Sequence, residues 1–210
     1  MFRPAVLLFA VLALSGLAAA PARATPVSAA ELLDAKLDYT ADFYVSSGAQ
    51  GKFQGTVVHT PGRERREFET TMGHEALLLR RDSDEAVMMW PERKYYVSTS
   101  FSAISSMVGG FEEVMLERRK IGADMIAGEP CARFEVSGES DSGGSFHGRM
   151  WFTRDNILMK AVGTARWRGK ETPVETGLLN LRRIKADPSA FVTPSDYQGL
   201  PIDLRKFGLR

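Results

Sequence analysis

Apolar and polar residues alternate along much of the chain, with the period of two that is typical of half-buried β-strands. Near the N-terminal end, Tyr39, Ala41, Phe43 and Val45 alternate with more polar neighbours. Short runs of this kind are separated by turn residues, which predicts an antiparallel meander. The expected strands are 38–45, 52–60, 64–70, 76–81, 85–90, 94–98, 114–121, 131–137, 146–153, 157–165 and 174–184.

Two stretches have helical spacing instead. Ser28 and Glu31 have the three-residue separation of a capping box, which predicts that a short helix begins there. The apolar face of this helix is expected to hold Leu32, Leu33 and Leu37. A second amphipathic helix is predicted later in the chain, where apolar residues recur at steps of three and four. These residues are Phe101, Ile104, Met107, Val108 and Phe111.

Some strands are apolar on both faces. The runs Leu77-Leu78-Leu79 and Val87-Met88-Met89-Trp90 do not alternate, although an antiparallel sheet with one wet face should alternate cleanly. Something must therefore cover the second face at this place. The helix around Ile104 and Met107 is one candidate cover, and a bound apolar ligand is another.

No internal repeat and no long linker divides the chain. Pro188, Pro194 and Pro201 indicate an irregular tail after the last strand. The pattern predicts one mainly β (α+β) domain, a large curved antiparallel sheet with two or three short helices.

The first 24 residues have the features of a secretory signal peptide. A basic start is followed by an apolar run over residues 6–17 and by small residues that end at Ala24. The run is shorter than the roughly 20 residues of a membrane-spanning helix, so cleavage after Ala24 is expected, and an uncleaved anchor is the alternative. Leu17 stands where a lipoprotein signal would have cysteine, so no lipid anchor is expected. The domain of residues 25–210 is therefore expected in the periplasm.

The charge balance excludes one class of partner. The chain has 27 Lys and Arg against 26 Asp and Glu, so no field of one sign is available to bind nucleic acid. The single cysteine, Cys131, cannot form an internal disulfide. It is expected to be a small buried residue in a strand, with an intermolecular disulfide or a reactive thiol as alternatives.

No motif in the sequence indicates catalysis. His74-Glu75 begins like a zinc-protease helix, but Leu78 stands where the second histidine ligand is required. Ser145 lies near His147, but no G-x-S-x-G nucleophile elbow surrounds it. The three histidines, of which His59 is the third, are expected on the surface or at strand edges. The sequence therefore predicts no enzyme, no metal site and no cofactor.

Several short motifs resemble the LolA-like superfamily of periplasmic lipoprotein carriers. They lie in segments spread over most of the chain after the signal peptide. The matching segments are Tyr39-Thr40-Ala41-Asp42-Phe43, Gly55-Thr56-Val57-Val58, Pro61-Gly62-Arg63-Glu64-Arg65, Leu77-Leu78-Leu79, Met89-Trp90-Pro91, Gly128-Glu129-Pro130-Cys131 and Phe191-Val192-Thr193-Pro194 with Tyr197. The resemblance implies an unclosed, curved antiparallel half-barrel plugged by short helices.

The sequence departs from the lipoprotein carriers at the turn arginine. The carriers usually place aromatic residues around it, whereas Glu64 and Arg66 flank Arg65 here. The G-x-x-C strand start at Gly128 instead resembles a branch of exported single-domain proteins. Binding of apolar ligands in general is therefore expected, rather than lipoprotein carriage in particular.

The leading hypothesis is a periplasmic module, acting as a monomer, that holds a lipid, an acyl chain or a lipoprotein tail in the concave groove of the sheet. The expected lining residues are Phe43, Leu79, Met88, Trp90, Ile104, Met107, Met150 and Phe152. By its family position, Arg65 is expected to hold the plugging helix or a ligand head group. The alternatives are an envelope-stress or protein-interaction domain with an envelope protein as partner, and a hydrolase without a recognisable motif.

Overall fold

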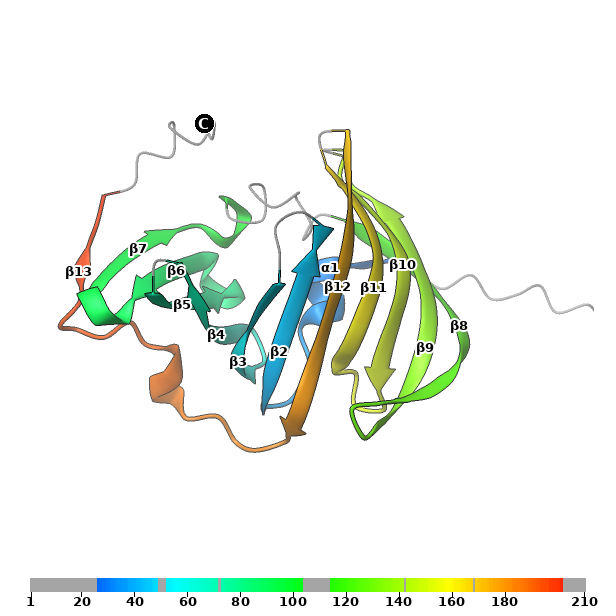
Figure 1. Cartoon of the computed structure of the whole chain (residues 1–210), viewed down its shortest axis with the longest axis horizontal. Coiled ribbons are helices and arrows are strands. Elements are labelled where there is room, and N and C mark those ends of the chain that lie inside the picture. Colours follow the sequence, from blue (N-terminus) through cyan, green and yellow to red (C-terminus); the bar gives the residue numbers. More distant parts are fainter. Residues whose placement is uncertain are drawn as a thin grey trace, which may run out of the picture.

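A single large curved sheet dominates the computed structural model of the chain (Figure 1). The structure describes residues 26–48, 52–71, 73–103, 114–141, 143–167 and 169–201. Within them, thirteen strands form one sheet, antiparallel except at one edge, which confirms the expected mainly β class and the unclosed curved architecture. The expected signal peptide, together with Ile104, Met107, Val108 and Phe111 of the second expected helix, lies outside the described residues.

The order of strands across the sheet is β1-β8-β9-β10-β11-β12-β2-β3-β4-β5-β6-β7-β13. The strands are β1 Val27–Ser28, β2 Tyr39–Ser47, β3 Lys52–Thr60, β4 Arg63–Thr70, β5 Gly73–Arg80, β6 Glu85–Trp90, β7 Tyr95–Thr99, β8 Met115–Ile126, β9 Glu129–Glu139, β10 Ser145–Thr153, β11 Leu158–Trp167, β12 Lys170–Arg182 and β13 Gln198–Gly199. Among the described residues, the helices with defined bounds are α1 Ala29–Leu33 and the short 3₁₀ turns η2 Arg81–Ser83, η3 Pro91–Arg93 and η5 Pro188–Phe191, and residues 101–103 are helical as well.

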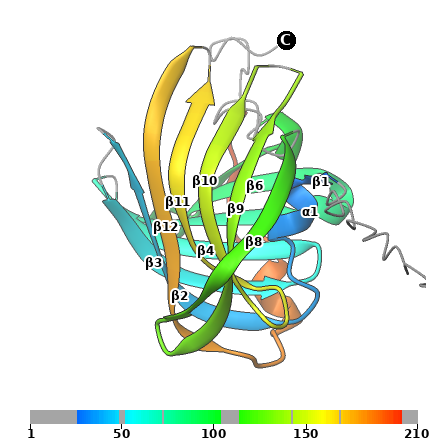
Figure 2. The same ribbon diagram turned by 90° about the vertical axis from the view of Figure 1, so that its right-hand side faces the viewer.

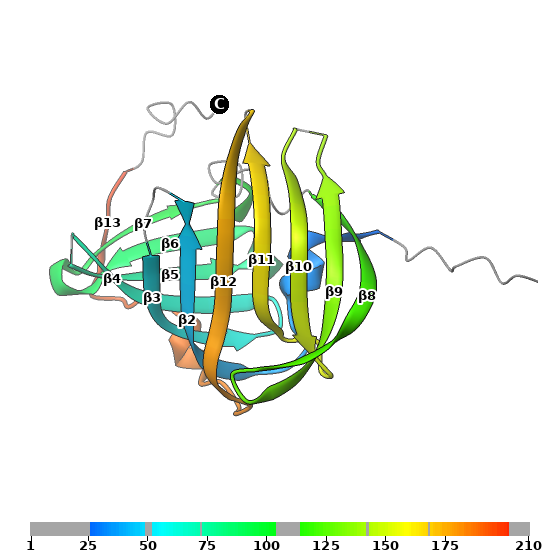
Figure 3. The ribbon, with the colours of Figure 1, turned by 45° about the vertical axis from the view of Figure 1, so that its right-hand side comes forward.

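The sheet bends so that its two halves face each other. Strands β8–β12 form one half and β2–β7 the other, and the pair β12–β2 joins them (Figures 2 and 3). Helix α1 lies on the inner side of this bend. We call the face on which α1 packs the inner face, and the opposite one the outer face.

Helix α1 begins as the capping box predicts, because the Ser28 hydroxyl accepts a hydrogen bond from the Glu31 amide at 3.1 Å. Its buried residues Ala29 and Leu32 pack in one cluster with Phe146, Met150 and Phe152 of β10. The helix is shorter than the sequence indicates. It ends at Leu33, so the expected place of Leu37 on its apolar face is wrong; Leu37 packs instead against a separate cluster that includes Tyr39 and Phe43.

Strand register identifies which side chains share the inner face, because residues directly opposite each other point to the same side. Met150 opposes Ala161, Ala161 opposes Thr176, and Thr176 opposes Val45. Tyr39 and Phe43 therefore also lie on the inner face, an even number of residues before Val45. From Tyr39 the same face continues across the other half of the sheet through the opposed residues His59, Glu64, Leu79, Ala86 and Thr99.

The segment after β12 covers the outer face of β4–β7. Phe191 of this segment is only 3% exposed and packs in a cluster whose sheet residues are Ala76, Leu78, Val87 and Met89. The guanidinium of Arg80 donates to the Phe191 carbonyl oxygen at 3.1 Å. We call residues 186–200 the C-terminal strap; it appears in orange and red in Figure 1.

The strap also supplies an edge strand that the sequence does not reveal. Its residues Gln198 and Gly199 pair in parallel with Tyr95 and Tyr96 of β7. The proline-rich tail is irregular elsewhere, as expected, except for the short turn η5. A two-residue strand has no periodicity, so its pairing could not be predicted.

We expect Phe191→Ala to lower the free energy of unfolding by about 3 kcal/mol, because a buried aromatic side chain is replaced by a cavity. The matched control is Val192→Ala, since the neighbouring Val192 side chain is 58% exposed and its loss should change stability by less than about 0.5 kcal/mol. Chemical denaturation of both variants provides the measurement. Equal stability of the two variants would show that the strap does not contribute to the core.

Candidate functional site

The inner face of β5–β7 carries an apolar row that the protein leaves partly open. Leu77, Met88 and Val97 oppose one another across these three strands, and each is only partly buried. On the outer face of the same strands, Leu78 and Val87 are completely buried beneath the strap. The two apolar faces predicted from the sequence are therefore present, and one is closed more tightly than the other.

The inner face brings together six of the residues proposed as groove lining. Phe43, Leu79, Met88 and Trp90 lie on it in the half formed by β2–β7, and Met150 and Phe152 lie on it in the other half.

Their surroundings differ, however. Met150 and Phe152 are 1% and 2% exposed, because α1 packs on them. Phe43 is also buried, at 4% exposure, whereas Met88 and Trp90 are partly exposed. The accessible part of the proposed lining is thus on β6 and its neighbours, and Ile104 and Met107 lie outside the described residues.

Arg65 points to the opposite side of the sheet. It opposes Val58 and Leu78, so it lies on the outer face. Its Nε donates to Glu67 at 2.7 Å and its Nη1 to the carbonyl oxygen of Ala190 in the strap at 3.3 Å. Arg65 therefore holds the strap, and the neighbouring Arg66 is the arginine that reaches the inner face.

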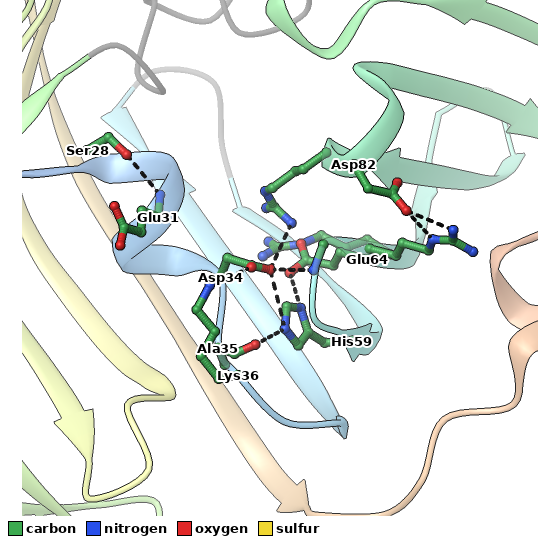
Figure 4. Close-up of polar contacts among 12 residues, drawn as sticks. Ser28, Glu31, Asp34, Ala35, Lys36, His59, Glu64 and Asp82 are labelled. Atoms are coloured by element: carbon green, nitrogen blue, oxygen red, sulfur yellow. Dashed lines mark hydrogen bonds and ion pairs between the residues drawn. The ribbon is translucent and has the colours of Figure 1, made fainter.

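A buried polar cluster lies on the inner face beside the apolar row (Figure 4). The expectation that His59 is on the surface or at a strand edge is wrong, because its side chain is completely buried. Its Nε2 donates to the Ala35 carbonyl oxygen at 2.9 Å, and its ring stacks on Tyr39 with centroids 4.7 Å apart. Nδ1 lies 3.5 Å from Oε2 of Glu64.

Glu64 is the buried acid of this cluster, at 3% exposure. Burial opposes its ionisation, but Arg66, His59 and Arg81 outweigh that cost and hold the pKa of Glu64 well below its usual range. Arg66 contributes most, since its Nε donates to Glu64 Oε1 at 2.7 Å. Glu64 is therefore a carboxylate at neutral pH, and it is paired on the inner face.

Asp34 connects this cluster to the end of α1. One of its carboxylate oxygens accepts a hydrogen bond from the amide of Gly62 at 2.8 Å and lies 3.8 Å from His59 Nε2. Gly62 has a φ of +81° in the β3–β4 turn, a conformation that favours glycine. The cluster thus fastens the residues after α1 to the β3–β4 hairpin, and we interpret it as structural.

The other two histidines lie in open surroundings, as expected. His74 is partly exposed and contacts Glu69 at 2.9 Å. His147 lines a shallow outer-face pocket of about 450 Å³ with Glu117 and Ser137, which oppose one another in register. Cys131 is buried in β9, as expected, and burial raises the pKa of its thiol to about 11.

Two further features are absent from the described part of the chain. No three or more His, Cys, Asp or Glu side chains are arranged there to hold a metal ion. None of the helices in that part is long and apolar enough to cross a membrane.

The open, bent sheet with an apolar inner face defines a class of half-barrel proteins. No protein-family model matches the chain, and no curated protein matches it either. Among solved structures, a conserved uncharacterised protein from Thermus thermophilus has a TM-score of 0.53 at 12% identity, over 81% of this chain and 94% of that one. The two proteins share a fold.

Two further solved structures are similar over most of this chain. The Pseudomonas aeruginosa MucA/MucB complex has a TM-score of 0.47 at 11% identity, over 82% of this chain and 62% of that one. A putative outer membrane lipoprotein-sorting protein domain from Vibrio parahaemolyticus has a TM-score of 0.41 at 11% identity, over 77% of this chain and 92% of that one.

We expect Glu64→Gln to destabilise the protein by about 3 kcal/mol at neutral pH, because Arg66 loses its buried carboxylate partner. The pKa of Glu64 is lowered on folding, so its contribution is complete above the ordinary value of 4.5 and is lost as the pH falls below it. The stability difference between wild type and variant should therefore shrink toward about pH 3. Denaturant titrations at both pH values measure this.

The control for this prediction is Glu69→Gln, on the same strand, where the side chain is 74% exposed. This variant should differ little from wild type at either pH. A Glu64→Gln variant that behaves in the same way would contradict a buried, ionised Glu64.

Proposed function

We propose that the chain is an exported, periplasmic module that binds the acyl chain of a lipid or a lipoprotein against the inner face of β5–β7. The observation that carries the proposal is the partly open apolar row of Leu77, Met88 and Val97. It lies near one edge of the sheet, where the strap closes the outer face. Apolar side chains gathered on an accessible concave surface are typical of ligand-binding sites.

The energetics of such binding need no catalytic chemistry. Each methylene group transferred from water to an apolar surface contributes about 0.8 kcal/mol. An acyl chain therefore supplies a large binding free energy, provided that most of its length is covered. Met88 suits this role because its flexible thioether side chain adapts to ligands of irregular shape.

We propose a structural rather than a catalytic role for the polar cluster. His59 is stacked on Tyr39 and bonded to a backbone carbonyl, so its ring is held in place rather than presented to a substrate. The Glu64 carboxylate is already paired with Arg66, which donates a hydrogen bond to it. These contacts support a structural role for the cluster beside the groove.

The proposal is tested on protein purified from the periplasm under native conditions. Native mass spectrometry and solvent extraction should recover lipid or fatty acid bound to the chain. Recovery of a protein partner without lipid would favour the alternative, a protein-interaction or envelope-stress domain. Absence of bound lipid together with no response to added fatty acid would refute the proposal.

We expect Met88→Asp to weaken fatty acid binding by at least about tenfold, because a carboxylate on the apolar row must be desolvated by the ligand. The Trp90 side chain lies on the same face of β6, so tryptophan fluorescence follows the titration. Val192→Asp is the control, because that side chain is exposed on the strap. Circular dichroism checks that both variants remain folded, and equal affinities in the two would place the ligand elsewhere.

A further inference from the structure

Three arginines lie on the inner face, each with its guanidinium over an aromatic ring. Arg66 lies 4.8 Å from the ring centroid of Phe43. The side chain of Arg81, which follows β5, lies 5.3 Å from the centroid of Phe101. In the other half of the sheet, Arg118 contacts two rings, those of Phe134 at 5.1 Å and Phe152 at 5.8 Å. Aromatic rings hold a cation in apolar surroundings without neutralising its charge.

Arg81 has two hydrogen-bond donors that the described residues do not pair, although Asp34 and Glu64 interact with its charge. Its Nε and Nη1 are buried and have no hydrogen-bond acceptor among them. The nearest ion-pair contact is from Nη1 to an Asp34 oxygen at 3.9 Å, which is too long for a hydrogen bond. Buried donors are almost always paired in native proteins, so two unpaired donors on a single cation form a place where an acceptor oxygen can bind.

Thr99 is a second residue with a buried polar atom that lacks a hydrogen bond among the described residues, and it lies at the same end of β5–β7 as Arg81. Its Oγ1 is buried without a hydrogen bond in the part of the chain that the structure describes. Thr99 opposes Ala86, which opposes Leu79, and Arg81 follows Leu79 by two residues. A hydroxyl donor and a guanidinium therefore lie at one end of β5–β7, beside the apolar row.

Arginines on the outer face pair with carboxylates at hydrogen-bonding distance, and so does Arg66 on the inner face, which donates to Glu64. Arg65 donates to Glu67, Arg80 pairs with Glu85, and Arg119 pairs with Glu135. Arg81 differs from all of these arginines, because its contact with the Asp34 carboxylate is too long for a hydrogen bond.

We propose that the ligand of the inner face is an anionic amphiphile, whose carboxylate or phosphate head group binds Arg81 and Thr99 while its chain lies along Leu77, Met88 and Val97. This inference rests on the proposed function and adds the chemical class of the head group. Arginine suits that class because its planar set of donors matches carboxylate and phosphate oxygens. The acceptor oxygens satisfy the donors that the protein leaves unpaired.

The experiment compares ligands with one chain and different head groups. Decanoate, decyl phosphate, decanol and decyltrimethylammonium are titrated against the full-length mature protein, and tryptophan fluorescence gives the dissociation constants. We expect the two anions to bind at least about tenfold more tightly than decanol, and the cation to bind most weakly. Inorganic phosphate alone should not bind over the same concentration range, which separates a lipid head group from a free anion.

Two variants assign the preference to residues. Arg81→Gln and Thr99→Val should each reduce the preference for anions over decanol, with the larger loss at Arg81, while the affinity for decanol stays unchanged. The control is Arg149→Gln, because Arg149 is exposed on the outer face of β10 and its loss should leave the preference intact. If Arg81→Gln fails to fold, Thr99→Val still tests the site, since it removes only a hydroxyl group.

The outcomes separate this inference from the proposed function. Equal binding of decanoate and decanol, or an unchanged preference in both variants, overturns the anionic head group and leaves apolar-ligand binding intact. Failure of every decyl compound to bind overturns both. Tight binding of inorganic phosphate that depends on Arg81, without a contribution from the decyl chain, overturns the amphiphile in favour of a free anion.

Discussion

The part of the sheet formed by β5–β7 has two apolar faces, and the rest of the structure depends on how each one is covered. An isolated sheet with two such faces would aggregate, because neither face can be left in water without cost. The C-terminal strap closes the outer face, and Phe191 enters the cluster around Leu78 and Val87. The inner face is covered in part by the bend of the sheet itself, and it stays accessible at Leu77, Met88 and Val97.

The bend in turn depends on polar contacts near α1. Asp34 and Ala35 follow the helix, and they bind Gly62 and His59 of the β3–β4 hairpin. This connection ties α1, which packs on β10, to the opposite half of the sheet. A connection made by buried charges costs desolvation free energy, because each ion loses its water. The mutual pairing of Glu64 with Arg66 offsets that cost, and the directional contacts define the arrangement of the two halves more sharply than apolar packing alone.

Much of the fold could be predicted from periodicity, since the strands of the β2–β7 meander begin and end near the expected residues. The failures have physical causes. Strand β8 continues to Ile126, beyond the expected end at residue 121, because a register shift between Lys120 and Gly122 interrupts its alternation. The burial of His59 could not be predicted, because its partners Ala35 and Asp34 come from a loop far away in the sequence.

The apolar part of the candidate site could be predicted from the sequence, but its arginines could not. The runs at Leu77 and Met88 indicated a second apolar face, and the structure places both residues on the inner side. Alternation also means that a shift of one residue reverses the face. A resemblance between motifs does not define the register, so Arg65 was expected near the ligand although its neighbour Arg66 is the inner residue. The unpaired donors of Arg81 leave no trace in the sequence at all.

The position of the inner arginines follows from the same constraint of two apolar faces. A lysine on this surface would need water or a carboxylate close to its compact charge, whereas a guanidinium can lie flat on a phenyl ring. The guanidinium of Arg66 has both kinds of partner, because it lies on the Phe43 ring and pairs with the Glu64 carboxylate. Arg81 has Phe101 but no hydrogen-bonded carboxylate among the described residues. The ligand that we propose matches this surface, because it combines an apolar chain with an anionic end.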